Sequence, residues 1–125
     1  MRAPEPMRGA RMVAAPAVLD AMSGPDGVIM LRLAPDDLLL ITHASFAFIG
    51  EPAIVEPEAG LMGWWLTPDE FEAVLEHVEW PLPTARPALA QGLIAGVPAK
   101  LWLTDDRSLL LCAAAYAHEL EERLR

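Results

Sequence analysis

Residues 60–78, GLMGWWLTPDEFEAVLEHV, contain the clearest change from strand to helix in the chain. The apolar run 60–66 predicts a β-strand. Thr67 then predicts a helix N-cap, because a proline and two acidic residues follow it and suit the first turn of a helix. Thr67 and Glu70 also have the spacing of a capping box. An apolar stripe at i, i+3, i+4 and i+7 from Phe71 completes the pattern of an amphipathic helix.

Other short apolar segments, separated by turn residues, predict the rest of a β-sheet. These strands are expected at 28–33, 38–42, 89–94, 99–103 and 108–112. A second helix is expected over 113–124, with its buried stripe at Ala113, Tyr116, Ala117, Leu120 and Leu124. This order of elements predicts an α+β fold, in which an antiparallel β-sheet has two main helices packed on one face.

The length and composition of the chain suit one small globular domain. Its 125 residues are enough for one domain and few for two. A hydrophobic content of 54% with 22% charged residues excludes a disordered chain. Residues 1–27 are rich in Pro, Gly, Ala and Met without clear periodicity, so we expect a poorly ordered or loosely attached N-terminal leader. Residues 28–125 would then form a single α+β domain.

The charge distribution excludes two classes of partner. The formal net charge is −9, and no Lys or Arg lies between Arg32 and Arg86, although ten acidic residues do. Clustered cations bind nucleic acids and anionic membrane surfaces, so neither is expected as a partner. No apolar run approaches the ~20 residues that span a bilayer. The single cysteine, Cys112, excludes an internal disulfide, which fits a cytoplasmic protein.

The residues capable of chemistry lack the spacing of known catalytic or ligand-binding motifs. The acidic residues of the first helix could form a metal patch or a carboxylate pair, but a solvated helix face is the better interpretation. These residues are Asp69, Glu72, Glu76 and Glu79. His43, His77 and His118 are scattered and lack the paired histidines of a zinc-protease motif. Cys112 lies in an apolar strand and is interpreted as a buried structural thiol. We therefore predict no catalytic, cofactor-binding or metal-binding residue in this chain.

The tryptophans indicate an interaction surface. Trp64 and Trp65 are adjacent in a strand, so their side chains must point to opposite faces of the sheet. Several strands are apolar on both faces, whereas two helices cover only one face. Either the leader and the loops cover the second face, or a partner chain does. If a partner does, the candidate interface residues are Trp65, Trp102, Leu61 and Lys100.

Several segments resemble the sarcosine oxidase gamma subunit family. Residues 60–75, followed by WPLP at 80–83, are similar to that family's strand, L-S-G-P turn, helix and C-P-L-D-L pattern. AQGLIAGVPAKLW at 90–102 is similar to its A-Q-T-x-L-A-x-V-P-x-x-L-W block. RLAPDDLLL at 32–40 resembles an earlier hairpin, and AYAHEL at 115–120 resembles the closing helix. The stretch RPALAQG departs from the family by lacking the Gly and Cys of its G-x-C-A-Q-T motif.

The resemblance implies a fold similar to that of the folate-binding aminomethyltransferases, which include the glycine-cleavage T protein. It implies a non-catalytic, structural subunit of a heterotetrameric, flavin- and folate-dependent oxidase of sarcosine or a related N-methyl amino acid. The implied partners are the larger flavoprotein subunits, alpha and beta, and a small delta-type subunit. FAD, FMN, NAD and tetrahydrofolate would bind to those partners, and this chain would bind no cofactor itself.

Two alternatives within the same superfamily stay open. The chain could be a free-standing module that binds tetrahydrofolate, with Glu56 or Glu58 as the candidate carboxylate against the pterin. It could also be a homodimer whose symmetric interface uses the face with Trp65 and Trp102.

Overall fold

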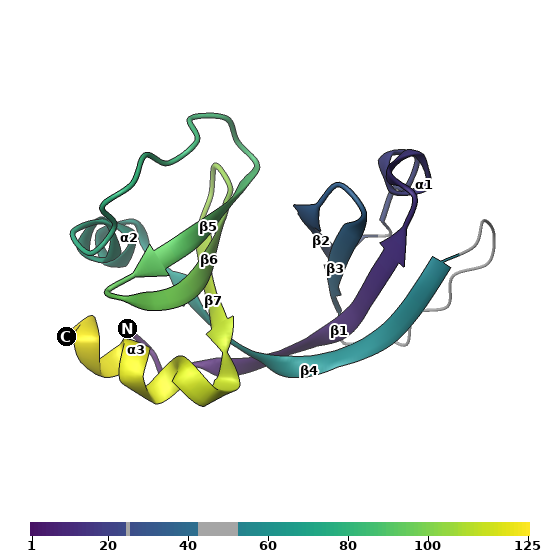
Figure 1. Ribbon diagram of the computed structural model, residues 1–125. Helices are drawn as coiled ribbons and strands as arrows, with labels where there is room; N and C mark the ends of the chain where they lie inside the picture. The colour runs from purple at the N-terminus through teal and green to yellow at the C-terminus, as the bar shows by residue number, and fades with distance from the viewer. Residues whose placement is uncertain (25, 43–52) are drawn as a thin grey trace. The chain divides into compact units, whose positions relative to one another are not determined.

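A computed structural model describes residues 1–24, 26–42 and 53–125 of the chain (Figure 1). The described elements are β1 (Glu5–Ala14), α1 (Pro16–Asp20), β2 (Ile29–Ala34), β3 (Asp37–Ile41), β4 (Ala53–Leu66), α2 (Pro68–Leu75), β5 (Ala88–Ile94), β6 (Val97–Leu103), β7 (Ser108–Ala113), a 3₁₀ turn (Ala114–Tyr116) and α3 (Ala117–Arg123). Hydrogen-bonded neighbours in the described sheet follow the order β2-β3-β1-β4-β7-β6-β5. The predicted α+β class with an antiparallel sheet is confirmed.

The chain divides into two compact units. The first unit contains Met1–Pro6 and Gly60–Arg125, and the second contains Met7–Ala59. Strands β1 and β4 each contribute residues to both units. No helix in the described ranges combines the length and the apolar character needed to cross a membrane.

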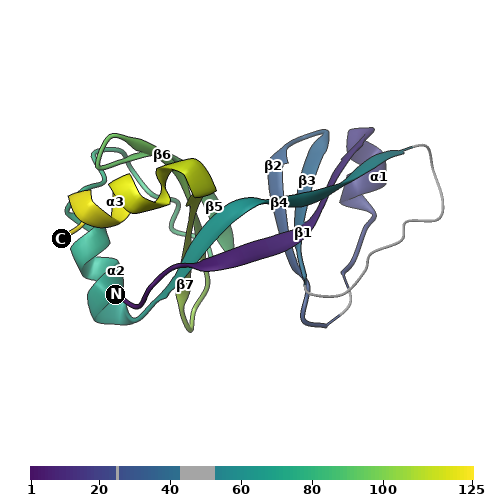
Figure 2. The same ribbon diagram turned by 90° about the horizontal axis from the view of Figure 1, so that it is seen from below.

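The first unit has its core between one sheet face and two helices. Register places Leu110 of β7 opposite Trp64 of β4 and opposite Leu101 of β6, so these side chains share a face. Val74 of α2 and Leu120 of α3 pack against the same cluster and are fully buried. Both views show α2 and α3 on the same side of β5, β6 and β7 (Figure 1, Figure 2). The prediction of two helices on one sheet face is confirmed in this unit.

Helix α2 begins at the predicted capping box. The Glu70 backbone N–H donates to the Thr67 hydroxyl at 3.2 Å, and the Thr67 backbone N–H donates to Glu70 Oε1 at 2.9 Å. Both N–H groups would otherwise lack partners at the helix start. The bond from the Thr67 backbone is the main reason that the pKa of Glu70 is lowered. The end of the preceding strand and the start of the helix are therefore fixed by local interactions.

The β5–β6 hairpin turns through Ala95 and Gly96, which both have positive φ (51° and 79°). A two-residue turn of this kind matches the twist of the flanking strands. The Arg123 guanidinium of α3 donates to the Ala95 carbonyl at 2.8 Å and pairs with Glu119. A Cβ on Gly96 would lie 2.7 Å from Arg123 Nη1. The C-terminal helix therefore holds the hairpin turn.

The C-terminal helix differs from its predicted extent. The backbone forms a 3₁₀ turn over Ala114–Tyr116 before α3 begins at Ala117. Ala117 and Leu120 are buried as predicted, but Ala113 is exposed and Tyr116 is 44% exposed. Ala113 still belongs to β7, and the 3₁₀ geometry of Ala114–Tyr116 changes the angular position of its side chains, so a stripe drawn at α-helical spacing fails before Ala117.

The second unit contains a strand where the sequence predicts a leader. Within residues 1–27 the structure forms β1, whose central residues pair antiparallel with β3, and the short helix α1. Met12 and Leu19 pack in a cluster with Leu38 and Leu40 of β3. A Cβ on Gly9 would lie 1.7 Å from the Leu40 carbonyl oxygen, so only glycine permits this approach. The expected poor order of the N-terminal leader is therefore corrected for the residues of β1.

Strands β2 and β3, which follow α1 in the sequence, form an antiparallel hairpin where the sequence predicts two strands. Strands β2 and β3 pair antiparallel across the turn after Ala34, with a bulge between Arg32 and Ala34. Arg32 donates to Asp20 at 2.6 Å and to the carbonyl of Pro35 at 2.8 Å, which ties α1 to the hairpin.

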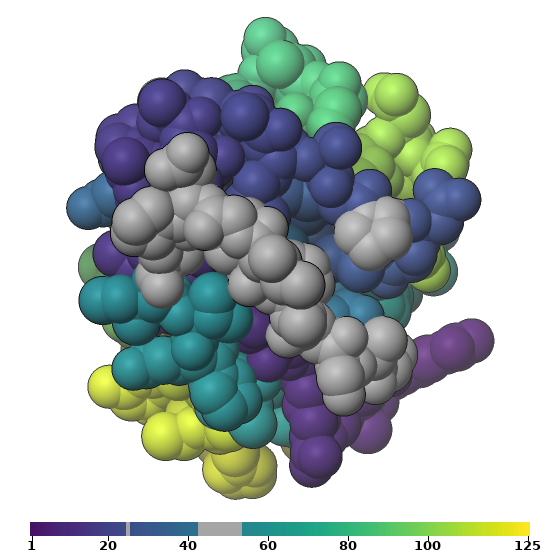
Figure 3. All heavy atoms as spheres, turned by 90° about the vertical axis from the view of Figure 1, so that its right-hand side faces the viewer, coloured from purple at the N-terminus to yellow at the C-terminus, as the bar shows by residue number. Residues whose placement is uncertain are grey.

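The start of β4, teal in Figure 3, lies on the surface with Ile54 63% exposed.

Candidate functional site

The four predicted interface residues lie on one face of the sheet in the first unit. Trp65 of β4 and Trp102 of β6 both lie opposite Leu109 of β7, and Lys100 of β6 lies opposite Leu111. Leu61 of β4 is four residues before Trp65 and therefore points to the same side. This face is opposite to the one that packs on α2 and α3. We call it the Trp102 face, consisting of Leu61, Trp65, Leu89, Leu93, Lys100 and Trp102.

The Trp102 face combines apolar side chains with one cation, Lys100, and a second cation, Arg107, lies against it. Its four predicted residues are half-buried, and Leu93 of β5 is 56% exposed. The Arg107 guanidinium carbon lies 3.7 Å from the centroid of the Trp65 ring, a cation–π geometry. Leu109 and Leu111, between the tryptophan-bearing strands, are fully buried. The structure thus brings the four residues onto one face, whereas their role in binding a partner stays a prediction.

Trp64 confirms the expected opposite orientation of the adjacent tryptophans. It belongs to the core cluster with Leu101 and Val74 and is 2% exposed. Its indole N–H has no hydrogen-bond partner in the described part of the chain. The two adjacent tryptophans therefore lie on opposite faces of the sheet. Trp64 packs in the core of the first unit, and Trp65 belongs to the Trp102 face.

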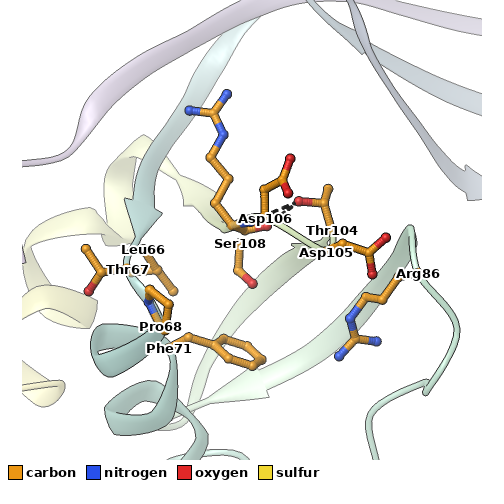
Figure 4. A pocket seen from close by; sticks show the side chains of 10 residues that line it. Leu66, Thr67, Pro68, Phe71, Arg86, Thr104, Asp105, Asp106 and Ser108 are labelled. Atoms are coloured by element: carbon orange, nitrogen blue, oxygen red, sulfur yellow. Dashed lines mark hydrogen bonds between the residues drawn. The ribbon is translucent and has the colours of Figure 1, made fainter.

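A pocket of about 260 Å³ lies where α2 begins (Figure 4). The β4–β7 register places Leu66 opposite Ser108, so the turn into α2 meets the β6–β7 turn. The wall on the helix side is apolar, with Leu66, Pro68 and Phe71. The remaining lining residues are polar: Thr67, Arg86, Thr104, Asp105, Asp106, Arg107 and Ser108.

No motif in the sequence indicates the polar lining of this pocket. The segment 104–107 predicts a turn, and the structure forms one: the Thr104 hydroxyl donates to the Arg107 carbonyl at 2.5 Å and accepts from the Arg107 N–H at 3.2 Å. Ser108 follows it as a buried polar residue, only 7% exposed. The one signal available in the sequence was a serine that opens an otherwise apolar strand. Leu66, Pro68 and Phe71, which also line the pocket, come from a distant segment, so their position beside Ser108 depends on the pairing of β4 with β7.

The other candidate residues of the described ranges lie in separate surroundings. His118 is exposed and lies 3.2 Å from Glu122, and His77 accepts a backbone hydrogen bond from Ala95 through its carbonyl. His43 lies outside the described residues. Burial raises the pKa of the Cys112 thiol to about 11, so the unreactive protonated form dominates. Among the described residues, no group of three or more His, Cys, Asp or Glu side chains could hold a metal ion.

The two candidate folate carboxylates lie in the second unit. Glu56 is exposed on β4, and Glu58 is partly buried. Arg11 forms an ion pair with Asp37, which raises the pKa of Arg11, and the fields of Glu58 and Glu56 raise it further. The charges of both carboxylates therefore stabilise the charged form of Arg11. Neither of them lines the pocket at the start of α2.

Comparison with known proteins finds similarity to solved structures. No family model and no curated protein sequence matches the chain. The chain is similar to a chain of the heterotetrameric sarcosine oxidase from Corynebacterium sp. U-96, whose structure contains pyrrole 2-carboxylate. The match has a TM-score of 0.69 and 17% sequence identity, and it covers 95% of this chain and 79% of that chain. At this identity the likeness establishes a shared fold.

Proposed function

We propose that this chain is a non-catalytic subunit of a heterotetrameric oxidase that acts on sarcosine or a related N-methyl amino acid. The observation that carries the proposal is the fold likeness to a chain of such a complex over 95% of the present chain. Because that likeness extends over nearly all the chain, the fold as a whole, and not one common motif, is shared. The motif resemblance in residues 32–40, 60–75, 80–83, 90–102 and 115–120 supports the same complex.

The docking surface that we propose is the Trp102 face. Aromatic and aliphatic side chains dominate the centres of protein interfaces, and charged ones fill the rim. Trp102 and Trp65 supply large apolar areas, while Lys100 and Arg107 supply charge beside them. Leu93, at 56% exposure, has much apolar area still to bury. This combination supports a surface on which a second chain packs.

In the proposed complex this chain has a structural role, and the other subunits bind the cofactors. Larger flavoprotein subunits of the alpha and beta types, with a small delta-type subunit, would complete the complex. FAD, FMN, NAD and tetrahydrofolate would bind to those chains. The acidic surface of this chain, with a net charge of −9, favours a partner surface with complementary positive charge.

The proposal is tested by isolating the tagged chain from the cells that normally make it. The chain is expected to co-purify with larger yellow flavoproteins, and the isolated assembly is expected to oxidise sarcosine or another N-methyl amino acid with formation of hydrogen peroxide. The same chain purified alone should be colourless and inactive. Recovery of the chain free of any flavoprotein would overturn the proposal. Tight tetrahydrofolate binding by the lone chain, or a stable homodimer, would favour one of the two alternatives.

Matched variants test the Trp102 face. Trp102→Ala removes an aromatic side chain from the proposed interface, whereas Tyr116→Ala removes an exposed aromatic side chain outside it. We expect Trp102→Ala to lower recovery of the flavoproteins by tenfold or more, as expected of an interface hot spot of roughly 2 kcal/mol. Tyr116→Ala should leave recovery unchanged. Equal recovery with both variants would exclude the Trp102 face as the docking surface.

A further inference from the structure

Strand β5 is an edge strand of the described sheet, and its own sequence does not protect it as an edge. A sheet edge presents backbone N–H and C=O groups to any further strand, and proteins block it with charged residues, prolines, bulges or a covering segment. The opposite edge strand, β2, contains Arg32 and has a bulge between Arg32 and Ala34. In contrast, β5 has the sequence ALAQGLI, without charge or proline, and pairs with β6 in unbroken register.

The register shows the direction in which the Leu93 carbonyl points. Ile94 and Val97 close the two-residue turn of the hairpin, and Leu93 lies opposite Pro98. Hydrogen-bonded and non-hydrogen-bonded pairs alternate along an antiparallel ladder, and proline has no N–H to donate. The Leu93 carbonyl therefore points away from β6, to the side on which a further strand would pair.

The segment that joins α2 to β5 occupies this side. We call it the strap, consisting of residues 76–87, which form neither helix nor strand. The Trp80 indole N–H donates to the Leu93 carbonyl at 2.8 Å, and the Ala95 N–H donates to the His77 carbonyl at 3.2 Å. The indole N–H thus takes the position that a backbone N–H of a neighbouring strand would need.

Apolar contacts hold the strap in this position. Val78, Trp80 and Leu82 pack against the core of the first unit. A Cβ on Gly92 would lie 2.6 Å from Trp80 Cε2, so the absence of a side chain at Gly92 permits the ring to lie against β5. The strap itself offers a poor edge, because three of its residues have no N–H: Pro81, Pro83 and Pro87.

We propose that the strap prevents a second copy of this chain from adding its own β5 to this edge. Two copies present the same uncharged strand, so antiparallel pairing about a two-fold axis would bring no like charges together along it. This pairing requires the Leu93 carbonyl, which Trp80 already occupies. The inference goes beyond the proposed function and does not depend on it, because it concerns the backbone edge of β5 and not the Trp102 face.

The experiment measures self-association of full-length chains by sedimentation velocity over a range of concentrations. Trp80→Ala removes the ring and its hydrogen bond, so it should lower the dissociation constant for self-association by about tenfold or more relative to the wild type. Gly92→Ala leaves every side chain of the strap in place but displaces the indole, and should act in the same direction. An unchanged dissociation constant in both variants would overturn the proposal.

A matched variant separates an opened edge from general destabilisation. Val74→Ala removes volume from the same core, where Val74 is 2% exposed, but leaves the strap against β5. It should associate no more than the wild type. Hydrogen exchange locates the new contact, since Trp80→Ala should show amide protection in β5 that rises with protein concentration. Equal association of Val74→Ala, or protection that rises only in other strands, would contradict a blocking role of the strap.

Discussion

The contact between Trp80 and Gly92 predicts the effect of a single methyl group. The Trp80 indole N–H donates to the Leu93 carbonyl at 2.8 Å, so the ring is held across the backbone of β5. A Cβ on Gly92 would lie 2.6 Å from Trp80 Cε2, 2.8 Å from Cζ2 and 2.9 Å from Nε1. Carbon atoms do not approach so closely, so Gly92→Ala must displace the indole.

The expected cost follows from three opposing terms. Overpacking costs about 1–3 kcal/mol, and loss of the hydrogen bond to Leu93 costs about 0.5–1.5 kcal/mol. Alanine in a strand gains about 0.5–1 kcal/mol over glycine by lowering the entropy of the unfolded chain. The first two terms exceed the third, so Gly92→Ala should lower the free energy of unfolding by about 1–3 kcal/mol.

Chemical denaturation followed by circular dichroism measures this loss, and a double-mutant cycle identifies its cause. In a Trp80→Ala background the clashing ring is absent, so Gly92→Ala should become neutral or stabilise the protein by up to about 1 kcal/mol. The sign of the effect therefore reverses between the two backgrounds. A Gly92→Ala protein as stable as the wild type, or an equal loss in both backgrounds, would refute a tight contact between Trp80 and Gly92.

Four further predictions concern the first unit. Thr67→Ala removes an N-cap and should lower the free energy of unfolding by about 1 kcal/mol in the same denaturation assay. Because the folded pKa of Glu70 is lowered, its stabilising contribution is complete above the pKa of the unfolded state and is lost as the pH falls through the folded pKa. Stability should therefore fall less steeply on acidification in Glu70→Gln than in the wild type, and parallel pH curves would contradict this. Arg123→Ala, which releases the β5–β6 turn, should cost about 1 kcal/mol, whereas Arg125→Ala, whose side chain is 74% exposed, should cost almost nothing. The Cys112 thiol, with a pKa of about 11, should react with a disulfide reagent at neutral pH only after unfolding, and rapid labelling of the native protein would show that it is accessible.

The elements that the sequence predicts well are those decided by neighbouring residues. The capping box of Thr67 and Glu70 needs contacts only three residues apart. The opposite orientation of Trp64 and Trp65 follows from the geometry of any strand. Trp65 and Trp102 lie on one face because both pair with Leu109, which the sequence alone does not specify.

The features that the sequence does not reveal depend on distant pairing. Strand β1 pairs with β3 although its buried positions are Ala and Met residues of weak β-propensity, and its Gly9 reads as a turn residue. Only the neighbouring Leu40 carbonyl explains that glycine. The pocket likewise forms because β4–β7 register places Leu66 opposite Ser108. No local pattern joins these two residues, which are far apart in the sequence.

The mass of the particle that contains this chain in its own cells tests the subunit role most directly. Native mass spectrometry of the gently isolated, tagged chain would give that mass and the identity of its components. We expect a single assembly of four different chains, with this 13.6 kDa chain as one member and flavin bound to larger ones. A particle of 13.6 kDa, or one built only from copies of this chain, would contradict the account.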